Sequence, residues 1–402
     1  MGAASVVSGA EVCKMQTIDA LNGWLISDGR LLGDEIQIVS TYCESLQRMG
    51  IPLSRVRIGQ RYSNPLISAW GIIWAPEGTQ TYTVDAGILD TQAWRGSPFE
   101  HVVATRSSLR KRLMDMDLSD AHSVYVELAE NGVTDFLAMP LEYGDGAVQG
   151  TSFSTTGPDG FTDAQVAMIE DTRHALASAL EPIAMRKSQV SLLQTYLGDG
   201  PAREIGQGHI RRGEHKTVSA AILFADLRGF TAKSETWTEA RLLEVMGDYF
   251  EMVVGPVQDA GGDVLKFMGD GVLAVFEEKT GAAQACEAAV SAASRSMGNL
   301  QEYNAARRRD GGEEIAFVIG VDFGEVTFGN IGSSGRLDFT VVGPAVNVAA
   351  RVQGLCKEKD ETCLLTADVA RHVSAQVEAL GDHAIRGLDH EIGIFRLPFP
   401  DG

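Results

Sequence analysis

The sequence predicts a two-domain protein of the α+β class, with a boundary near residue 200. The chain has 402 residues, 44% hydrophobic and 22% charged, which is enough apolar material for more than one core at ordinary domain sizes. Helix-like and strand-like runs follow one another in both halves. Between the halves, residues 198–213 are rich in glycine and arginine, as expected of a linker. These three observations predict one α+β domain on either side of a connecting segment.

Composition narrows the class of partner. The formal net charge of -20 argues against a nucleic-acid partner, because phosphate backbones require a basic face. The richest apolar run, residues 66–75, is shorter than the ~20 residues that span a bilayer, and the N-terminus lacks a signal-peptide pattern. The five cysteines, none of them in C-x-x-C spacing, are Cys13, Cys43, Cys286, Cys356 and Cys363. We therefore expect a cytoplasmic protein with buried reduced thiols, without a membrane partner.

The first half begins with residues 1–18, which are expected to be a loose lead-in. Apolar residues at helical spacing predict a helix over 34–49, which Gly50 and Pro52 end. The next predicted elements are strands at 54–58, 67–74 and 80–84, a helix near 99–113, and strands at 136–143 and 149–155. Thr162 and Gln165 form a capping box that opens a long helix.

Pro182 interrupts this long helix and is expected to kink or divide it, because proline removes a backbone donor. Beyond it, apolar residues form a stripe that either pairs with its twin in a dimer or packs on its own domain. These residues are Ile183, Val190, Leu193 and Leu197. The expected linker runs over 182–214, helical at first and then rich in glycine and arginine.

Residues 136–180 resemble the end of a GAF domain, with strand, turn, strand and then Phe161-Thr162-Asp163-x-Gln165 leading into the last helix. The resemblance implies a GAF-like sensor domain over 19–181 with a possible small-molecule ligand of unknown identity. Aromatic residues either line such a pocket or belong to the core: Trp70, Trp74, Tyr82 and Trp94. Two alternatives are open for the histidines and cysteines of this half. His101, His122 or His174 could bind haem and Cys13 or Cys43 could hold a bilin, or these residues have purely structural roles.

The second half alternates strands and helices, which predicts an α/β sandwich over 215–397. The strands are expected at 218–226, 264–268, 272–276, 315–321, 340–342 and near Cys363. The helices are expected at 238–260, 281–309, from Ala345, and at 367–373.

Two aspartates end apolar runs in this half and stand beside glycine-containing turns. Asp226 follows Ala221-Ile222-Leu223-Phe224-Ala225, and Asp270 lies in Lys266-Phe267-Met268-Gly269-Asp270-Gly271. Alone, Asp226 fits a helix cap and Asp270 fits a hairpin turn. Together they suit a pair of hard divalent cations that hold a polyphosphate. The backbone amides from Arg228 through Gly229 and Phe230 to Thr231 could cradle phosphate oxygens.

A third segment, residues 340–351, places Asn347 and Arg351 four residues apart on one helix face. With the two aspartate motifs in this order, the second half resembles the class III nucleotidyl cyclases over about 180 residues. The resemblance implies the cyclase α/β sandwich with a ferredoxin-like core. It also implies two Mg²⁺ or Mn²⁺ ions held by Asp226, Asp270 and the backbone carbonyl of Leu227, with ATP as substrate.

The resemblance also implies a base-reading pair. Lys266 lies four residues before Asp270, where related adenylate cyclases carry a lysine that reaches adenine N1. A lysine is a pure donor and suits the acceptor of adenine. Thr340, seven residues before Asn347, stands where many members have aspartate, and its hydroxyl can accept from the 6-amino group. This departure leaves GTP as an open alternative.

The remaining implied roles concern the phosphates. Asn347 orients the ribose, Arg351 stabilises charge on the α-phosphate, and Arg386 grips the terminal phosphates where the family has lysine. The residues after Arg386 depart from the family pattern. Because the metal aspartates and the Asn/Arg pair come from different subunits in this family, the resemblance implies a homodimer with two composite sites.

The sequence therefore predicts an adenylate cyclase regulated by its N-terminal domain. The alternatives are a guanylate or dual-specificity cyclase and a non-catalytic nucleotide-binding signalling protein. The last should lack a metal or transition-state residue, and none is missing. No P-loop pattern occurs, and residues 144–150 miss the dinucleotide fingerprint by one position.

Overall fold

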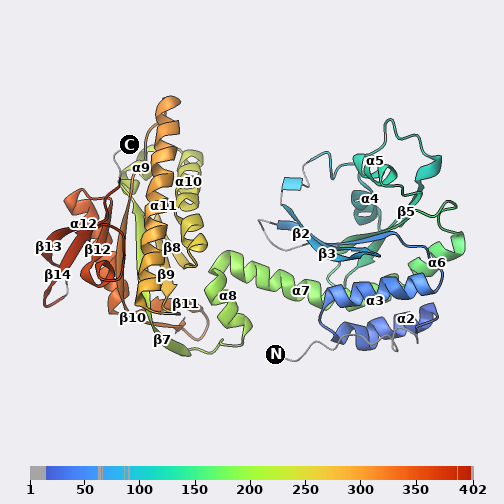
Figure 1. The fold of residues 1–402 in the computed structure, drawn as a ribbon, viewed down its shortest axis with the longest axis horizontal. Coiled ribbons are helices and arrows are strands. Elements are labelled where there is room, and N and C mark those ends of the chain that lie inside the picture. The colour runs from blue at the N-terminus through green and yellow to red at the C-terminus, as the bar shows by residue number, and fades with distance from the viewer. Residues whose placement is uncertain are drawn as a thin grey trace. The chain divides into compact units, whose positions relative to one another are not determined.

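The fold is taken from a computed structural model that describes residues 15–61, 65, 67–85, 87, 88, 91–386 and 388–399. The chain divides into two compact units, Met1–Leu192 and Leu193–Gly402, which are treated separately below. Both units combine helices with a mostly antiparallel sheet (Figure 1), as the α+β class requires. No helix among the described residues is long and apolar enough to cross a bilayer.

The N-terminal unit is built on a six-stranded antiparallel sheet in the order β3-β2-β1-β6-β5-β4. Its strands are β1 (Arg55–Arg61), β2 (Ile67–Ala75), β3 (Gly78–Asp85), β4 (Leu109–Arg112), β5 (Asp135–Glu142) and β6 (Val148–Thr155). Alternate residues of β1 face opposite sides of the sheet. Val56 and Ile58 enter the main core, and Arg55 and Arg57 therefore lie on the other face.

Helices cover both faces of this sheet. The main core receives α2 (Ile18–Trp24), the short π-helix η1 (Leu25–Gly29), α3 (Glu35–Arg48), α6 (Asp163–Asp171) and the first half of α7 (Arg173–Leu197). The opposite face carries α4 (Pro98–Thr105), η3 (Leu113–Asp115) and α5 (Ser123–Glu130). The capping box at Thr162 is present, with Gln165 as its partner.

Three features of this unit differ from the sequence predictions. The expected helix over 99–113 ends at Thr105, because Arg106 adopts a left-handed conformation (φ 56°) and β4 then pairs with β5. The long helix breaks at Thr172 between α6 and α7, while α7 runs through Pro182. Of the apolar stripe, Ile183 is packed in the core of this unit and Val190 is exposed.

The proposed ligand-binding residues of this unit separate into two groups. Trp70 and Trp74 are core residues, whereas Tyr82 and Trp94 line a cavity on the other face. The histidines lie apart, His101 in α4, His122 at the N-cap of α5 and His174 in α7. Cys43 is buried and free, as are Cys286, Cys356 and Cys363, which confirms the expected unpaired thiols; Cys13 lies outside the described residues.

The C-terminal unit contains an eight-stranded sheet in the order β13-β14-β12-β10-β7-β9-β8, with β11 paired to β10. Its strands are β7 (His215–Leu227), β8 (Asp263–Met268), β9 (Gly271–Glu277), β10 (Phe317–Gly332), β11 (Leu337–Val342), β12 (Cys363–Thr366), β13 (Glu378–Ala384) and β14 (Glu391–Arg396). β10 is longer than predicted because it pairs with β7 along its length, from Phe317 opposite Leu227 to Gly329 opposite His215.

The two faces of this sheet are covered by different helices. α10 (Glu239–Asp259) and α11 (Ala282–Arg309) pack side by side on one face, and α12 (Pro344–Lys359) packs on the other (Figure 1). The smaller helices are α8 (Asp199–Gly206), α9 (Phe230–Thr236) and α13 (Ala367–Ala370). α8 is helical where the glycine-rich sequence predicted irregular linker.

Candidate active site

Asp226 and Asp270 lie at the same end of the central strands. Asp226 is the penultimate residue of β7, and Asp270 sits in the two-residue turn between β8 and β9. β9 pairs antiparallel with β7 in a register that places Val272 opposite Ala225. Gly269 adopts φ 67°, a left-handed conformation that glycine takes without cost. The sheet register therefore brings together two carboxylates that are 44 positions apart in the printed sequence.

The two carboxylates interact strongly. Burial, the hydrogen bond that the protonated Asp270 carboxyl donates to Asp226, and the negative charge of Asp226 raise the pKa of Asp270 to about 6. Tyr249 of α10 is fully buried, and its hydroxyl has no hydrogen-bond partner among the described residues. Burial and the charges of both aspartates raise the pKa of Tyr249 well above its ordinary value. Negative charge is thus concentrated at this point without full compensation.

The structure adds two contacts that the sequence analysis missed. Lys357 forms an ion pair with Asp226 Oδ2, and Gln353 Nε2 donates to the same oxygen at 3.3 Å. Both residues lie in the second half of α12, where their i,i+4 spacing puts them on one face. That spacing predicts a shared helix face, but nothing in the sequence links the face to Asp226. The partner carboxylate is 131 residues away along the chain.

The segment after Asp226 has two distinct parts. Arg228 is committed elsewhere, because its backbone amide donates to the Ala316 carbonyl at 2.8 Å and its guanidinium pairs with Asp360 at 2.5 Å. The expected phosphate contact of Arg228 is therefore not available in this conformation. Gly229 caps α9 with φ 70°, and Phe230 and Thr231 form the first turn of that helix.

The predicted base-reading residues lie on neighbouring strands. Lys266 of β8 pairs with Asp338 of β11, with Nζ and Oδ2 2.5 Å apart. Thr340 lies two residues after Asp338, so both side chains belong to the same face of β11. Thr340 is 9% exposed. Asp338, which the sequence analysis did not single out, holds the lysine ammonium beside Thr340.

The predicted transition-state and phosphate residues are solvent-accessible. Asn347 is exposed and Arg351 half-buried on α12, and no described residue forms an ion pair with Arg351. Arg386 is exposed just beyond β13, the edge strand of the sheet. Three strands, β14, β12 and β10, separate β13 from β7 in the sheet order, so Arg386 does not join the two aspartates within one chain.

Metal-binding capacity rests on a small donor set. Among the described residues no group of three or more His, Cys, Asp and Glu side chains is placed to hold a metal ion. Two carboxylates and the carbonyl of Leu227 remain, and these hard oxygen donors are what Mg²⁺ and Mn²⁺ prefer. The raised pKa of Asp270 and the unpartnered Tyr249 hydroxyl indicate a place where added positive charge is favourable. The residues present thus fit divalent cations.

Comparison with known proteins agrees with this geometry. The family model for the adenylate and guanylate cyclase catalytic domain matches residues 213–397. These residues are therefore similar to a cyclase catalytic domain. The matched region spans the strands and helices that hold both aspartates, Lys266, Thr340, Asn347 and Arg351.

Individual relatives match over the same half of the chain. An adenylate cyclase of Anabaena cylindrica is 31% identical over 201 residues, which cover 48% of this chain and 39% of the relative. Adenylate cyclase 1 of Rhizobium meliloti is 26% identical over 199 residues, covering 48% and 29% respectively. The crystal structure of the adenylyl cyclase CyaB from P. aeruginosa matches 47% of this chain and 97% of its own, with 24% identity and a TM-score of 0.42. The chain thus spans less than half the length of these curated relatives.

Proposed function

We propose that this chain is an adenylate cyclase that converts ATP to 3′,5′-cyclic AMP and pyrophosphate. The observation that carries the proposal is the pair of interacting carboxylates, Asp226 near the end of β7 and Asp270 in the turn between β8 and β9, within a region similar to the cyclase catalytic domain. A carboxylate pair at this position suits the binding of cations that hold a triphosphate. The reaction is placed in the cytoplasm, where ATP is available and thiols stay reduced.

Two Mg²⁺ or Mn²⁺ ions would be held by Asp226, Asp270 and the carbonyl of Leu227. When bound, they would activate the ribose 3′-hydroxyl and neutralise charge on the triphosphate. Lys357, which pairs with Asp226 in this structure, would give up that contact to solvent when the cations are held, because a divalent cation offers the carboxylate more charge. The amides of Gly229, Phe230 and Thr231 are proposed to bind phosphate oxygens.

Base selection is assigned to Lys266 and Thr340. The pairing with Asp338 fixes the Lys266 ammonium beside Thr340, so a donor and a hydroxyl can meet the edge of one base. Adenine offers an acceptor at N1 and donors at the 6-amino group, which match these two groups in order. Guanine presents a donor at N1, which a lysine ammonium cannot accept. ATP is therefore the proposed substrate, and GTP the alternative that Thr340 leaves open.

The geometry of α12 supports a homodimer. Successive helix residues are turned by about 100°, so the Asn347/Arg351 face is turned by roughly 120° from the Gln353/Lys357 face that contacts Asp226. One chain therefore cannot direct both faces at the same nucleotide. We propose that Asn347, Arg351 and Arg386 act on a nucleotide held by the aspartates of a second copy.

Exposed apolar residues lie at the places such a dimer would cover. Phe267 is 52% exposed and Met268 45% exposed beside Asp270, and Val342, at 45%, ends β11 just before α12. Apolar side chains of this size gain stability when buried. Within the composite site, Asn347 would orient the ribose and Arg351 would stabilise negative charge at the α-phosphate.

The experiment is a product assay on the purified full-length protein. ATP or GTP is supplied with Mn²⁺ or Mg²⁺, and cyclic nucleotide and pyrophosphate are measured, with Asp270→Ala as the matched control. Cyclic AMP from the native protein and none from Asp270→Ala is the expected result. Cyclic GMP in excess of cyclic AMP would overturn the base assignment and leave the metal site standing.

Regulation by the N-terminal unit is the last part of the proposal. Residues 214–402 retain every proposed catalytic residue, so this fragment is expected to make cyclic AMP. Because the fragment lacks the N-terminal unit, its rate is expected to differ from that of the full chain. Equal rates at equal dimer concentration would contradict regulation. Absence of product from both proteins under all conditions would favour a non-catalytic nucleotide-binding role.

A further inference from the structure

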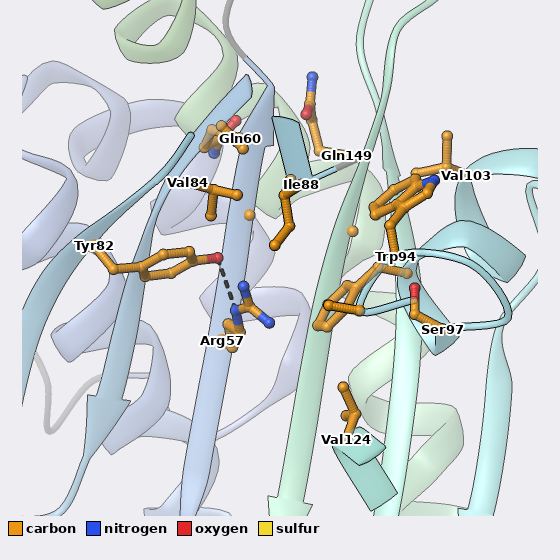
Figure 2. Close-up of a pocket in the computed structure, with 15 residues that line it drawn as sticks. Arg57, Gln60, Tyr82, Val84, Ile88, Trp94, Ser97, Val103, Val124 and Gln149 are labelled. Carbon is orange, nitrogen blue, oxygen red and sulfur yellow. Dashed lines mark hydrogen bonds between the residues drawn. The ribbon is translucent and has the colours of Figure 1, made fainter. Parts of the chain in front are cut away.

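The N-terminal unit contains a cavity of about 110 Å³ on the face of the sheet opposite α3 and α7. Figure 2 shows Arg57, Tyr82 and Val84 on one side of it and Trp94, Ser97 and Val103 on the other. An engineered apolar cavity of about 150 Å³ is known to accept benzene. The smaller volume here therefore limits an enclosed ligand to one ring at most.

Two glycines, Gly59 and Gly150, line this cavity, and Gly71 lies under the Tyr82 ring beside it. Gly59 of β1 pairs with Gly71 of β2, and Gly150 of β6 lies beside them, its carbonyl 3.2 Å from where a Cβ on Gly59 would stand. A Cβ on Gly71 would collide with the Tyr82 ring, and one on Gly150 would stand 2.7 Å from Phe99 Cδ1. The absence of side chains at these positions lets both aromatic rings lie against the sheet and keeps the cavity open.

Arg57 projects into this aromatic setting. Its Cζ is 4.6 Å from the centre of the Tyr82 ring and 4.7 Å from that of Phe99, and its Nε donates to the Tyr82 hydroxyl at 2.9 Å. These contacts hold the guanidinium in place. Among the described residues, no hydrogen bond uses its two terminal nitrogens and no carboxylate forms an ion pair with it. The outer edge of the guanidinium is thus available to an acceptor.

A second cation increases the positive charge on this face. Arg55 lies two residues before Arg57 on the same side of β1, and both border a smaller adjoining cavity of about 90 Å³. Burial and repulsion from Arg57 lower the pKa of Arg55, and Glu127 offsets part of this effect. Two guanidinium groups beside one nearby carboxylate favour an anionic ligand.

We propose that this cavity binds a compact carboxylate with a single apolar ring, of about the size of benzoate. The carboxylate accepts two parallel hydrogen bonds from the terminal nitrogens of Arg57, a geometry for which a guanidinium is preorganised. The ring lies among Val84, Trp94 and Val103. Apolar walls exclude a bare inorganic anion as the best occupant, because part of the cavity would stay unfilled. This binding does not depend on the catalytic activity proposed above.

Benzoate and its neutral analogue benzamide are the probes. The full-length chain is titrated with each by calorimetry, with saturation-transfer NMR on the ring protons as a second readout. Hydrogen bonds to a charged group contribute about 1.5–3 kcal/mol, so benzoate should bind at least about 10-fold more tightly than benzamide. In Arg57→Gln this preference should disappear.

Arg55→Gln is the matched control, because it removes the same charge from the same face of the same strand. It should weaken benzoate binding by less than about threefold, since Arg55 borders the adjoining cavity and not this one, and donates no hydrogen bond to the bound carboxylate. Equal losses in the two variants would reduce the site to general electrostatic attraction and overturn the proposal. Arg57→Lys keeps the positive charge but loses the planar guanidinium, and it serves as the second variant if Arg57→Gln misfolds. It should show an intermediate preference for benzoate over benzamide. Equal affinity of the native chain for both probes, or no saturable binding of either, would also overturn it.

Discussion

The carboxyl group of Asp322 in the middle of β10 should make the C-terminal unit less stable as the pH rises. Asp322 is 4% exposed, and its Oδ1 accepts from the Thr366 hydroxyl at 2.6 Å. Burial raises its pKa to about 6, although hydrogen bonds from Thr366 and the Phe323 amide oppose the shift. The folded state therefore holds a proton on Asp322 that the unfolded state has already released.

The sign and magnitude follow from linkage. The folded-state pKa is raised from 3.8 to about 6, so the stabilising contribution is complete below pH 3.8 and is lost as the pH rises through about 6. At about 1.36 kcal/mol for each unit, the total loss is about 3 kcal/mol. Of this, about 1.4 kcal/mol falls above pH 5, on the basic side of the isoelectric point of 4.8. For a domain of this size that corresponds to about 3–6 °C in melting temperature.

Asp322→Asn provides the comparison, because asparagine keeps an oxygen for the Thr366 hydroxyl but does not titrate. Both proteins are compared by differential scanning calorimetry between pH 5 and 7.5, in the unfolding transition whose melting temperature the substitution changes. The melting temperature of the variant should rise by about 3–6 °C relative to that of the native chain as the pH increases over this range. A melting-temperature difference that stays constant across this range would show that Asp322 has no raised pKa in the folded state and would contradict the prediction.

Three further substitutions test other parts of the account. Lys266→Met should lower kcat/KM for ATP by about 10- to 100-fold and reduce the preference over GTP, because a charge-assisted donor is lost; an unchanged ATP/GTP ratio would contradict the base assignment. Arg351→Lys should lower kcat by about 100- to 1000-fold with little change in KM, as expected of a group that acts on transition-state charge; an effect confined to KM would argue against that role. Gly71→Ala should destabilise the N-terminal unit by about 1–3 kcal/mol, because the new Cβ collides with Tyr82 and the Ile58 carbonyl. Gly132→Ala is the control, because Gly132 is a left-handed glycine with open space around it, so that this variant reports backbone strain alone. Equal shifts in melting temperature for the two variants would contradict the steric explanation.

Much of the fold was predictable because long periodic segments have little freedom. The helices at α3, α10 and α11 and the strands β2, β5 and β6 lie where apolar spacing predicted them. The errors fall where distant residues decide the outcome. Residues 109–112 look helical in isolation and become β4 because β5 offers an edge to pair with. Pro182 is accommodated in α7, which packs on the core through the residues around it.

The residues of the candidate site also fall into those that local sequence predicts and those that long-range packing places. Asp226 and Asp270 could be predicted because each stands in a short motif whose backbone requirements are local. Lys357 and Tyr249 could not, since only the packing of α12 and α10 on the sheet brings them to the carboxylates. Arg228 was assigned to phosphate from its position after Asp226, and long-range contacts with Ala316 and Asp360 hold it elsewhere. The GAF resemblance of the N-terminal unit stays a prediction.

The composite site is tested most directly by mixing two inactive variants. Asp270→Ala removes a metal ligand, and Arg351→Ala removes the guanidinium that the account assigns to the opposite subunit. Each alone should make almost no cyclic AMP. Random reassortment of equal amounts should restore about one quarter of the native activity, because half of the dimers are mixed and each mixed dimer has one intact site. A mixture as inactive as its components, under conditions where subunits are shown to exchange, would contradict a site shared between two chains.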